Sequence, residues 1–516
     1  MAKINLDALI KREDFEVQES TNSGSKKATV SIEDLVPDSF FFPNLRKPDF
    51  QRETSEWDGK KVVEFLESFL DGDLIPAIIL WRSPSGYLFV IDGSHRISSL
   101  ASWINDDYGD GEISKKFYDG IIPEDQISTA IKTRNLVRKK IGSYKDFKLA
   151  LTNPDKVEQF IIQRAKNLSA LAIQLQWVEG DANKAEVSFF KINRQAAPIN
   201  PTELILLESR KKPNCIAARA IIRSGKGHKY WSIFSLEKQQ EIQNLAKEIN
   251  SILFAPPLRT PVKTLDIPIA GKVYSAQALS LILDFINISN GISQDFKETL
   301  GDDDTGDKTI RYLENARKVA WRINSSHASS LGLHPIIYFY SIDGRHKIAS
   351  FYATVAFVME LDKKNYFKEF ISIRPAFEEF LPKYDYLVQQ IFRRYRSAIN
   401  SFIHIKDFYF VVINELKQNK TPEQAIAALL KTEKYNYLSL QTGNIDITSD
   451  EFSVDRKSAV FIKEAIASAP KCKICNGYIH INSVTIDHKI RKQDGGRGSI
   501  DNGQIAHPYC NTTVKN

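Results

Sequence analysis

The sequence has few of the features that mark membrane, secreted or disulfide-bonded proteins. Its 516 residues include only four cysteines. No apolar run reaches the roughly 20 residues that a membrane-spanning helix needs. The first residues, Met-Ala-Lys-Ile-Asn-Leu-Asp, lack the apolar core of a signal peptide. We therefore expect a cytoplasmic protein with no membrane partner, and the length predicts about two to four domains.

Long-range repetition is also missing. The chain shows no solenoid-like period, no helix-turn-helix and no repeated zinc finger. A homing or mobile-element nuclease needs such elements to read a long DNA site, so the sequence disfavours that class. One short echo relates 91–97 to 342–348, and chance explains it better than duplication.

The positive charge is concentrated near the C-terminus. The formal net charge is +7, and residues 456–516 alone contain ten basic and four acidic residues. A concentrated positive field suits the phosphate backbone of a nucleic acid. Charge by itself fits an ordinary solvated surface at least as well, so the motifs must decide.

The pattern of apolar residues predicts an α+β multidomain protein. Residues 77–81 and 87–91 are β-rich runs joined by Ser-Pro-Ser-Gly, which is typical of a hairpin, and 171–178 predicts another strand. The middle of the chain is mainly helical, because apolar residues recur there every three or four positions. The predicted helices of this middle part are 235–254, 308–323, 348–361, 376–399 and 408–416.

These patterns divide the chain into four parts. Residues 1–27 are polar and predict a loosely held leader. An α/β domain is expected next, then a helical connector and a small basic module. The predicted ranges are 28–210, 211–455 and 456–516.

The C-terminal module contains two pairs of metal-binding residues. Cys472 and Cys475 form the first pair, and His507 and Cys510 form the second. Without a secretion signal, a Cys-x-x-Cys pair indicates metal before disulfide. Four such ligands suit a closed tetrahedral Zn²⁺ site, which would stabilise a module too small to bury much core.

Between and beside these pairs lie residues suited to cutting a phosphodiester. His488 can act as a general base, because imidazole titrates near neutral pH. Asp487 and Asn511 offer oxygen ligands to Mg²⁺ or a similar ion. The amide of Asn502 can hold a turn together, and Gly495-Gly496 lets the chain bend back.

This arrangement resembles the HNH endonuclease family in its zinc-bearing subtype, over residues 470–516. The resemblance implies a ββα-metal fold, with Asp487 and Asn511 as ligands of a catalytic Mg²⁺ or Mn²⁺. It further implies His488 as the general base and Asn502 as the structural asparagine. His507 stands where the subtype usually has cysteine. Two alternatives stay open: His507 serves the catalytic metal and no zinc binds, or the tail is a zinc ribbon or degenerate HNH module without catalysis.

A second group of polar residues lies in the α/β part. Gln51-Arg52 is followed by Trp57, and a predicted strand ends in Asp92-Gly93-Ser94-His95-Arg96. The Asp-Gly turn leads into a predicted helix whose free N–H groups can bind an anion. Arg52 and Arg96 can reach phosphate as forked donors, Asp92 can hold Mg²⁺ or a ribose, and His95 can orient a phosphate. Taken singly, each also fits a plain turn or a surface ion pair.

The order of these residues resembles the ParB-like domains with an Asp-Gly-Gln-x-Arg motif in GmrSD- and SspE-type antiphage restriction proteins, over residues 40–210. The resemblance implies a ParB/sulfiredoxin-like α/β fold that binds or hydrolyses ATP, GTP or CTP. Ser94 replaces the usual glutamine. The nucleotide-binding residues it implies are Arg52, Asp92, Gly93, Ser94, His95 and Arg96.

The sequence therefore predicts a metal-dependent HNH DNA endonuclease regulated by an N-terminal nucleotide-binding and DNA-sensing domain. Foreign or modified DNA is the expected substrate, in antiphage defence. One HNH site that cuts both strands favours a homodimer or two successive nicks. The main alternative is a nucleotide-switched DNA-binding protein with a non-catalytic zinc module, and a further one is a sulfiredoxin-like or kinase activity.

Overall fold

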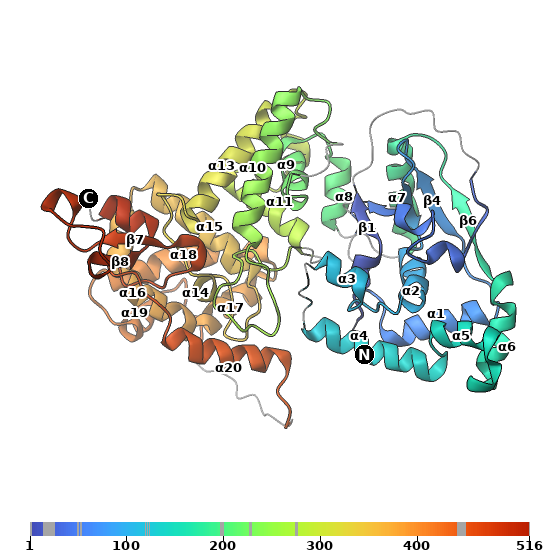
Figure 1. The fold of residues 1–516 in the computed structure, drawn as a ribbon. Coiled ribbons are helices and arrows are strands. Elements are labelled where there is room, and N and C mark those ends of the chain that lie inside the picture. The colour runs from blue at the N-terminus through green and yellow to red at the C-terminus, as the bar shows by residue number, and fades with distance from the viewer. Residues whose placement is uncertain are drawn as a thin grey trace. The chain divides into compact units, whose positions relative to one another are not determined.

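The computed structural model describes residues 3–13, 26–48, 51, 54–118, 120, 122, 124–196, 201–225, 230–273, 277–440 and 450–514. These residues form two compact units, which are coloured along the chain in Figure 1. The first unit comprises Met1–Glu208 with Gly227–Ile233, and the second comprises Ser209–Lys226 with Phe234–Asn516. No helix in the described ranges combines the length and the apolarity needed to cross a membrane.

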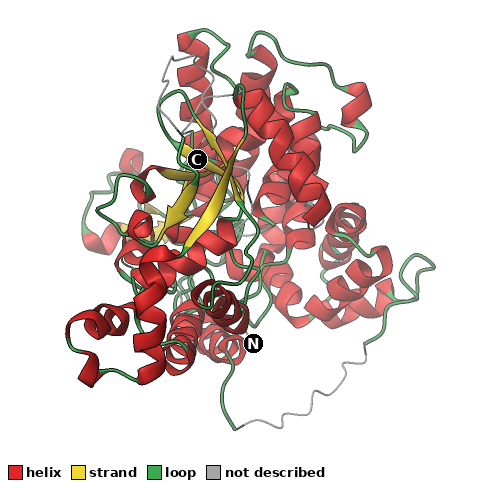
Figure 2. Cartoon of the chain, turned by 90° about the vertical axis from the view of Figure 1, so that its right-hand side faces the viewer, coloured by secondary structure: helices red, strands yellow, loops and turns green. Residues whose placement is uncertain are grey.

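The first unit is built on a six-stranded mixed sheet, whose strands are yellow in Figure 2. Its strand order is β1-β3-β5-β4-β6-β2. The predicted hairpin is present as the antiparallel pair β4 and β5, and the other neighbours are parallel except β6 and β2. The strands are β1 (Lys11–Glu13), β2 (Thr29–Ser31), β3 (Leu45–Pro48), β4 (Ile78–Arg82), β5 (Leu88–Asp92) and β6 (Ala172–Trp177).

Helices cover both faces of this sheet. The helices of this unit are α1 (Gly59–Leu70), α2 (Ser94–Ile104), α3 (Glu112–Phe117), α4 (Glu124–Lys140), α5 (Tyr144–Thr152), α6 (Gln159–Asn167), α7 (Ala182–Ala196) and α8 (Pro201–Glu208). Alternate residues of a strand point to opposite faces. Val90 therefore joins the large core around α1 and α2, whereas Phe89 and Ile91 pack with Phe189 of α7.

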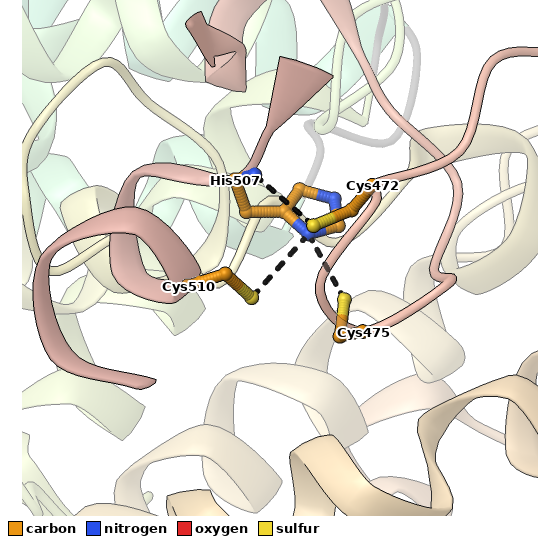
Figure 3. Close-up of side chains that lie close together, drawn as sticks. All are labelled: Cys472, Cys475, His507 and Cys510. Atoms are coloured by element: carbon orange, nitrogen blue, oxygen red, sulfur yellow. Dashed lines mark hydrogen bonds between the residues drawn. The ribbon is translucent and has the colours of Figure 1, made fainter. Parts of the chain in front are cut away.

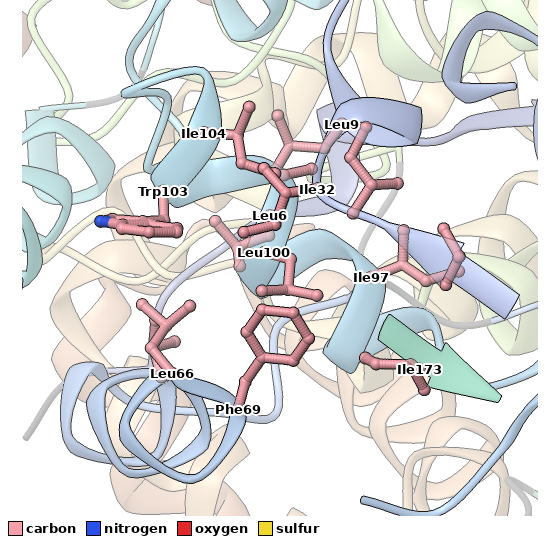
Figure 4. Close-up of a cluster of buried hydrophobic side chains, with 14 of the residues drawn as sticks. Leu6, Leu9, Ile32, Leu66, Phe69, Ile97, Leu100, Trp103, Ile104 and Ile173 are labelled. Atoms are coloured by element: carbon pink, nitrogen blue, oxygen red, sulfur yellow. The ribbon is translucent and has the colours of Figure 1, made fainter. Parts of the chain in front are cut away.

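The N-terminal residues take part in the large core. Figure 4 shows Leu6 and Leu9 in the same cluster as Leu100 and Ile104 of α2. Strand β1 adds a parallel edge to β3. The prediction of a loosely held leader is therefore wrong for residues 3–13. Their few apolar side chains pack into the core, although the polar residues between them make the segment look solvent-exposed in the sequence.

A buried ion pair fixes this N-terminal segment to the sheet. The ammonium of Lys47, in β3, lies 2.5 Å from the carboxylate of Asp7, and both side chains are buried. The guanidinium of Arg12 adds a second cation at 3.0 Å. Asp7 also accepts a hydrogen bond from the backbone N–H of Thr54 at 3.0 Å. The network therefore ties residue 7 to β3 and to the loop that follows β3.

The second unit is mainly helical, as predicted. Its helices are α9 (Pro213–Ile222), α10 (Leu236–Phe254), α11 (Ala278–Ser289), α12 (Phe296–Thr299), α13 (Asp307–Ile323), α14 (Pro335–Tyr338), α15 (Ile348–Lys363), α16 (Phe367–Lys383), α17 (Asp385–Tyr395), α18 (Ala398–Leu416), α19 (Pro422–Leu429) and α20 (Val454–Ala467). The single helix predicted at 376–399 is wrong. Tyr384 separates α16 from α17, and Arg396 ends α17 with a φ of 66° that a right-handed helix excludes.

The unit ends in a two-stranded antiparallel sheet of β7 (Thr485–His488) and β8 (Gly503–Ala506). A short π-helical turn, η9 (Cys510–Val514), follows. This small hairpin and the helical region belong to one compact unit. The observed classes of structure confirm the predicted α+β architecture with a sheet first, helices in the middle and a small C-terminal sheet.

The Asp7 network yields a prediction about stability. Burial by itself raises the pKa of Asp7, but the charges of Lys47 and Arg12 outweigh it and hold that pKa well below the ordinary value. The ionised carboxylate therefore stabilises the fold above its unfolded-state pKa of about 3.9. We expect Asp7→Asn to lower the free energy of unfolding at pH 7 by about 3–5 kcal/mol, as when one partner of a buried pair is removed.

Urea denaturation followed by tryptophan fluorescence measures this effect, because five of the six tryptophans lie in the first unit. As the pH falls below about 4, Asp7 becomes protonated in the unfolded chain but stays ionised in the fold, where its pKa is lowered. The stabilisation from the network, and with it the difference between the two proteins, should therefore shrink progressively. Asp71→Asn, which removes an exposed pair with Arg164, is the control and should cost less than about 1 kcal/mol. Equal losses in both variants would contradict a structural role for the network.

Candidate metal centre and active site

The Asp487-His488 pair lies at the end of β7 and is held by β8. Asp487 pairs with Gln504, and His488 pairs with Gly503. The carboxylate of Asp487 is buried and accepts a hydrogen bond of 2.7 Å from the side-chain amide of Gln504. His488 is half-buried. The hairpin thus fixes the aspartate through its cross-strand partner, a residue that the sequence motif did not single out.

Asn502 closes the loop between the two strands. Its side-chain oxygen accepts from the backbone N–H of Ile490 at 2.7 Å. Its amide group donates to the backbone carbonyls of Ile490, at 3.2 Å, and Arg497, at 2.8 Å. One side chain therefore satisfies three backbone groups across the loop. This arrangement is what a structural asparagine requires.

Asn511 comes to the same hairpin from the turn η9. Its side-chain amide donates to the hydroxyl of Thr485 at 3.2 Å. Thr485 and Asp487 lie two positions apart in β7, so they share one face of the strand. Asn511 therefore lies on the face of the hairpin that carries Asp487. Two oxygen-bearing side chains that are distant in sequence are brought to one side of the strand.

Cys472, Cys475, His507 and Cys510 converge in one buried cluster, which Figure 3 shows. One ligand atom from each residue lies within 4.8 Å of the others. Nδ1 of His507 is 3.3 Å from Sγ of Cys475 and 3.9 Å from Sγ of Cys510. The two predicted pairs are thus brought together, and soft sulfur and imidazole ligands in a closed set of four fit Zn²⁺.

The orientation of the His507 ring suits this role. Its Nε2 lies 2.9 Å from the backbone carbonyl of Tyr478 and can only donate to it. Nδ1 is then the nitrogen with a lone pair, and it faces the sulfurs. Burial, aided by the charge of Arg374, lowers the pKa of His507, so the ring is neutral at pH 7. This geometry favours membership of the cysteine cluster over the alternative in which His507 serves the catalytic metal.

The protonation state of Cys472 also suits a metal ligand. Hydrogen bonds from Cys475 and Cys510 lower the pKa of Cys472, which favours its thiolate. All four cysteines are free, including Cys215, which lies buried in α9 away from the cluster. A cluster of thiols and one imidazole at these distances needs a cation to hold more than one thiolate. The donor set therefore fits the metal that the sequence implies.

In the first unit, Asp92 ends β5, Gly93 makes a tight turn, and Ser94, His95 and Arg96 form the first turn of α2. Gly93 has a φ of +97°, and a Cβ there would lie only 3.0 Å from the side chain of Ile78. Only glycine suits this position. Arg96 donates to the carboxylate of Asp92 at 2.5 Å and to the backbone carbonyl of Pro76 at 2.5 Å. The sequence predicts that the guanidinium of Arg96 binds phosphate. In the structure, at least two of its N–H groups instead stabilise the turn.

Neighbouring residues hold Ser94 and His95. The amide of Gln51 donates to the hydroxyl of Ser94 at 3.2 Å. Nε2 of His95 accepts from the backbone N–H of Glu56 at 3.3 Å, and its ring stacks on Trp57. The predicted residues 92–96 thus meet the segment that follows β3, at the N-terminus of α2. Arg52 lies outside the described residues.

Sequence reasoning missed several residues that support these sites. Asp7 and Lys47 brace the loop beside Gln51, and Gln504 holds Asp487. Arg374 lies beside the cysteine cluster although 98 residues separate it from Cys472. Gln504 precedes His507 by only three positions but belongs to none of the sequence motifs. The others depend on long-range packing.

A hairpin that carries an Asp-His pair next to a cluster of potential metal ligands is typical of a nuclease module, and the junction of β5 and α2 brings together a second group of polar residues. Residues 472–516 match the HNH endonuclease family model. Residues 32–208 match the model described as the N-terminal domain of the GmrSD restriction endonuclease. No match is found among curated proteins or among solved structures. The chain thus carries a GmrSD-type N-terminal domain and an HNH endonuclease domain, and the pair supports a restriction endonuclease.

The cysteine cluster predicts where a structural metal binds. Apparent zinc-binding energies in small folded modules are about 10 kcal/mol or more, so losing one ligand should remove most of the metal. We expect Cys475→Ala to purify with little zinc and to melt at a lower temperature than the wild type. Elemental analysis and thermal melting measure both. Cys215→Ala is the matched control, and zinc retained equally by both variants would argue against the cluster as the site.

Proposed function

We propose that the protein is a divalent-metal-dependent DNA endonuclease that cuts foreign or modified DNA under the control of its N-terminal domain. The observation that carries this proposal is the hairpin whose strand β7 ends in Asp487 and His488, with Asn511 on the face of Asp487 and the cysteine cluster immediately next to that asparagine. A plain zinc ribbon needs the cluster but has no need of this set.

Each residue has a role in hydrolysis. Asp487 and Asn511 would hold Mg²⁺ or Mn²⁺, which supplies charge stabilisation at the scissile phosphate. His488 would take a proton from the attacking water at an imidazole nitrogen. Asn502 keeps the loop between the strands closed, so that the hairpin presents His488 in one position. Gln504 holds the carboxylate of Asp487.

The basic surface supports DNA as the substrate. Lys489, Arg491, Lys492 and Arg497 lie in the loop that Asn502 closes, directly after His488. Cations at this position would contact phosphates on either side of the scissile bond and would make binding dependent on salt. Contacts of this kind fix position but carry no base sequence. Recognition of a modification therefore falls to the first unit.

For the first unit we propose nucleotide binding at the N-terminus of α2. The first N–H groups of a helix and a glycine turn in the left-handed conformation form a site for phosphate. Asp92 and Arg96 hold the turn in shape. The match to the GmrSD N-terminal domain supports the same role. A regulated nuclease would spare the DNA of its host, which gives the pairing of the two domains a reason.

The nuclease proposal is tested by cleavage of supercoiled plasmid. Removal of a general base costs about 10²- to 10⁴-fold in rate, so His488→Ala should nick or linearise DNA at least a hundredfold more slowly. The reactions contain Mg²⁺ or Mn²⁺, with and without ATP, GTP or CTP, on ordinary and phage-modified DNA. His404→Ala, a half-buried histidine on α18, is the control and should cut like the wild type.

Each outcome selects between the two functions. Cleavage that is lost with His488 supports the nuclease. Intact DNA binding with no cleavage under any of these conditions would favour a nucleotide-switched DNA-binding protein with a non-catalytic zinc module.

The nucleotide site is tested by binding. We expect Arg96→Ala to weaken nucleotide binding by about 10- to 100-fold, because the turn loses charge-assisted hydrogen bonds worth about 1.5–3 kcal/mol. Equilibrium dialysis with ATP, GTP and CTP measures the affinities. Arg164→Ala is the matched control, since Arg164 makes a similar forked pair with Asp71. If the wild type binds none of the three, the proposed role of this turn is wrong.

A further inference from the structure

Helix α16 carries a buried ion pair, Arg374 and Glu378, that lies next to the cysteine cluster. Nε of Arg374 lies 2.6 Å from Oε1 of Glu378, one turn later in the same helix, and both side chains are fully buried. A buried guanidinium is costly unless its hydrogen bonds are satisfied. Nη1 also donates to the backbone carbonyl of Leu331 at 2.5 Å, and Nη2 to that of Gly332 at 2.9 Å. These contacts hold the guanidinium in one orientation.

This guanidinium lies beside two of the four metal-binding residues. Nη1 of Arg374 is 3.3 Å from Nδ1 of His507 and 3.9 Å from Sγ of Cys475. Three thiolates and a neutral imidazole around Zn²⁺ carry one net negative charge. A fixed cation at the edge of that set offsets this charge, and the effect is larger in a buried region than in water. An arginine guanidinium stays protonated in proteins, so this positive charge is permanent.

Glu378 extends the same contact to the backbone around the metal. Its Oε2 accepts from the backbone N–H of Tyr478 at 2.9 Å, and Oε1 accepts from the hydroxyl of Tyr338 at 3.1 Å. Tyr478 is the residue whose carbonyl receives Nε2–H of His507. The carboxylate therefore holds the peptide that orients the histidine ring. Arg374 thus contacts Nδ1 of His507 directly, whereas Glu378 acts on the Nε2 side through Tyr478.

The loop before α14 contacts the segment that carries Asn511. The carbonyl of Ser330 accepts from the backbone N–H of Tyr509 at 3.0 Å, and that of Ala328 accepts from the hydroxyl of Thr512 at 3.0 Å. Gly332, with a φ of +61°, lies so close to the His507 ring that a Cβ would collide with it. The residues on both sides of Asn511 are therefore attached to the helical region.

We propose that Arg374 and Glu378 are positioning residues that complete the metal site from the helical region and couple that region to the nuclease hairpin. The coupling to catalysis rests on the proposed function, because it acts through His507 and Cys510 on the neighbouring Asn511. The support of the metal site does not depend on nuclease activity. Outer-shell partners of this kind typically change metal affinity by about 10- to 100-fold when they are replaced.

Two conservative variants of the full chain test the proposal. Arg374→Lys keeps the positive charge but loses the planar guanidinium that donates several hydrogen bonds at once. Glu378→Gln keeps the size of the side chain but loses its negative charge. We expect both to release zinc to a colour-forming chelator about 10- to 100-fold more readily than the wild type. Lys347→Gln, which removes an ion pair with Asp385 between α15 and α17, is the matched control and should release zinc at the wild-type rate. Wild-type release from both folded variants would overturn the proposal.

Hydrogen exchange of the wild type gives a second test that needs no variant. Removing zinc with a chelator should increase exchange in α16 around residues 374–378 and in 328–332, as well as in 472–510. Helix α10 serves as the internal control and should not change. An increase confined to 472–510 would overturn the coupling. Neither test measures cleavage, so an inactive His488→Ala protein and a failed coupling remain distinguishable.

Discussion

The nuclease hairpin depends on the convergence of four metal-binding side chains on one point. A segment of some 45 residues can bury little apolar surface, and only a few of its side chains are in the core. The cluster replaces that missing core by joining the segment before β7 to the segment after β8. Asn511 follows directly on Cys510, so the geometry of the cluster also determines where that asparagine lies. The same cluster therefore stabilises the fold of this module and positions a residue that the sequence predicts to bind the catalytic metal.

In the GmrSD-type domain, a buried network of charged residues fixes the position of the predicted site. Its turn between β5 and α2 lies against the segment after β3, and the position of that segment depends on Asp7, Lys47 and Arg12. The matched family region begins at residue 32, whereas Asp7 and Arg12 come earlier in the chain. Residues that precede the matched region thus help to shape the neighbourhood of the predicted site. A buried pair of this kind specifies one arrangement more than it adds net stability.

The helical region is more than a linker between the two domains that match family models. Its helix α16 and the loop before α14 contact the metal site through a connected set of hydrogen bonds around Arg374 and Glu378. A connected polar network in a buried region has few alternative arrangements, because each displaced group would lose a partner. Such a network can transmit a displacement of the helices to the hairpin. Independent folding of the C-terminal module is correspondingly disfavoured.

The sequence by itself determined the motifs, since residue type and spacing reveal local chemistry. The Cys-x-x-Cys pair, Asp487-His488 and the Asp92-Gly93 turn are all short-range patterns, and so are the strands β4 and β5 and most of the helices. Tertiary structure decided the rest. The break at Tyr384, the burial of apolar side chains from residues 4–10, the brace on Asp7 and the approach of Arg374 to Cys475 follow from contacts between distant segments. No periodicity records such contacts, because a lone charged residue has the same appearance in a sequence whether it meets water or a metal site.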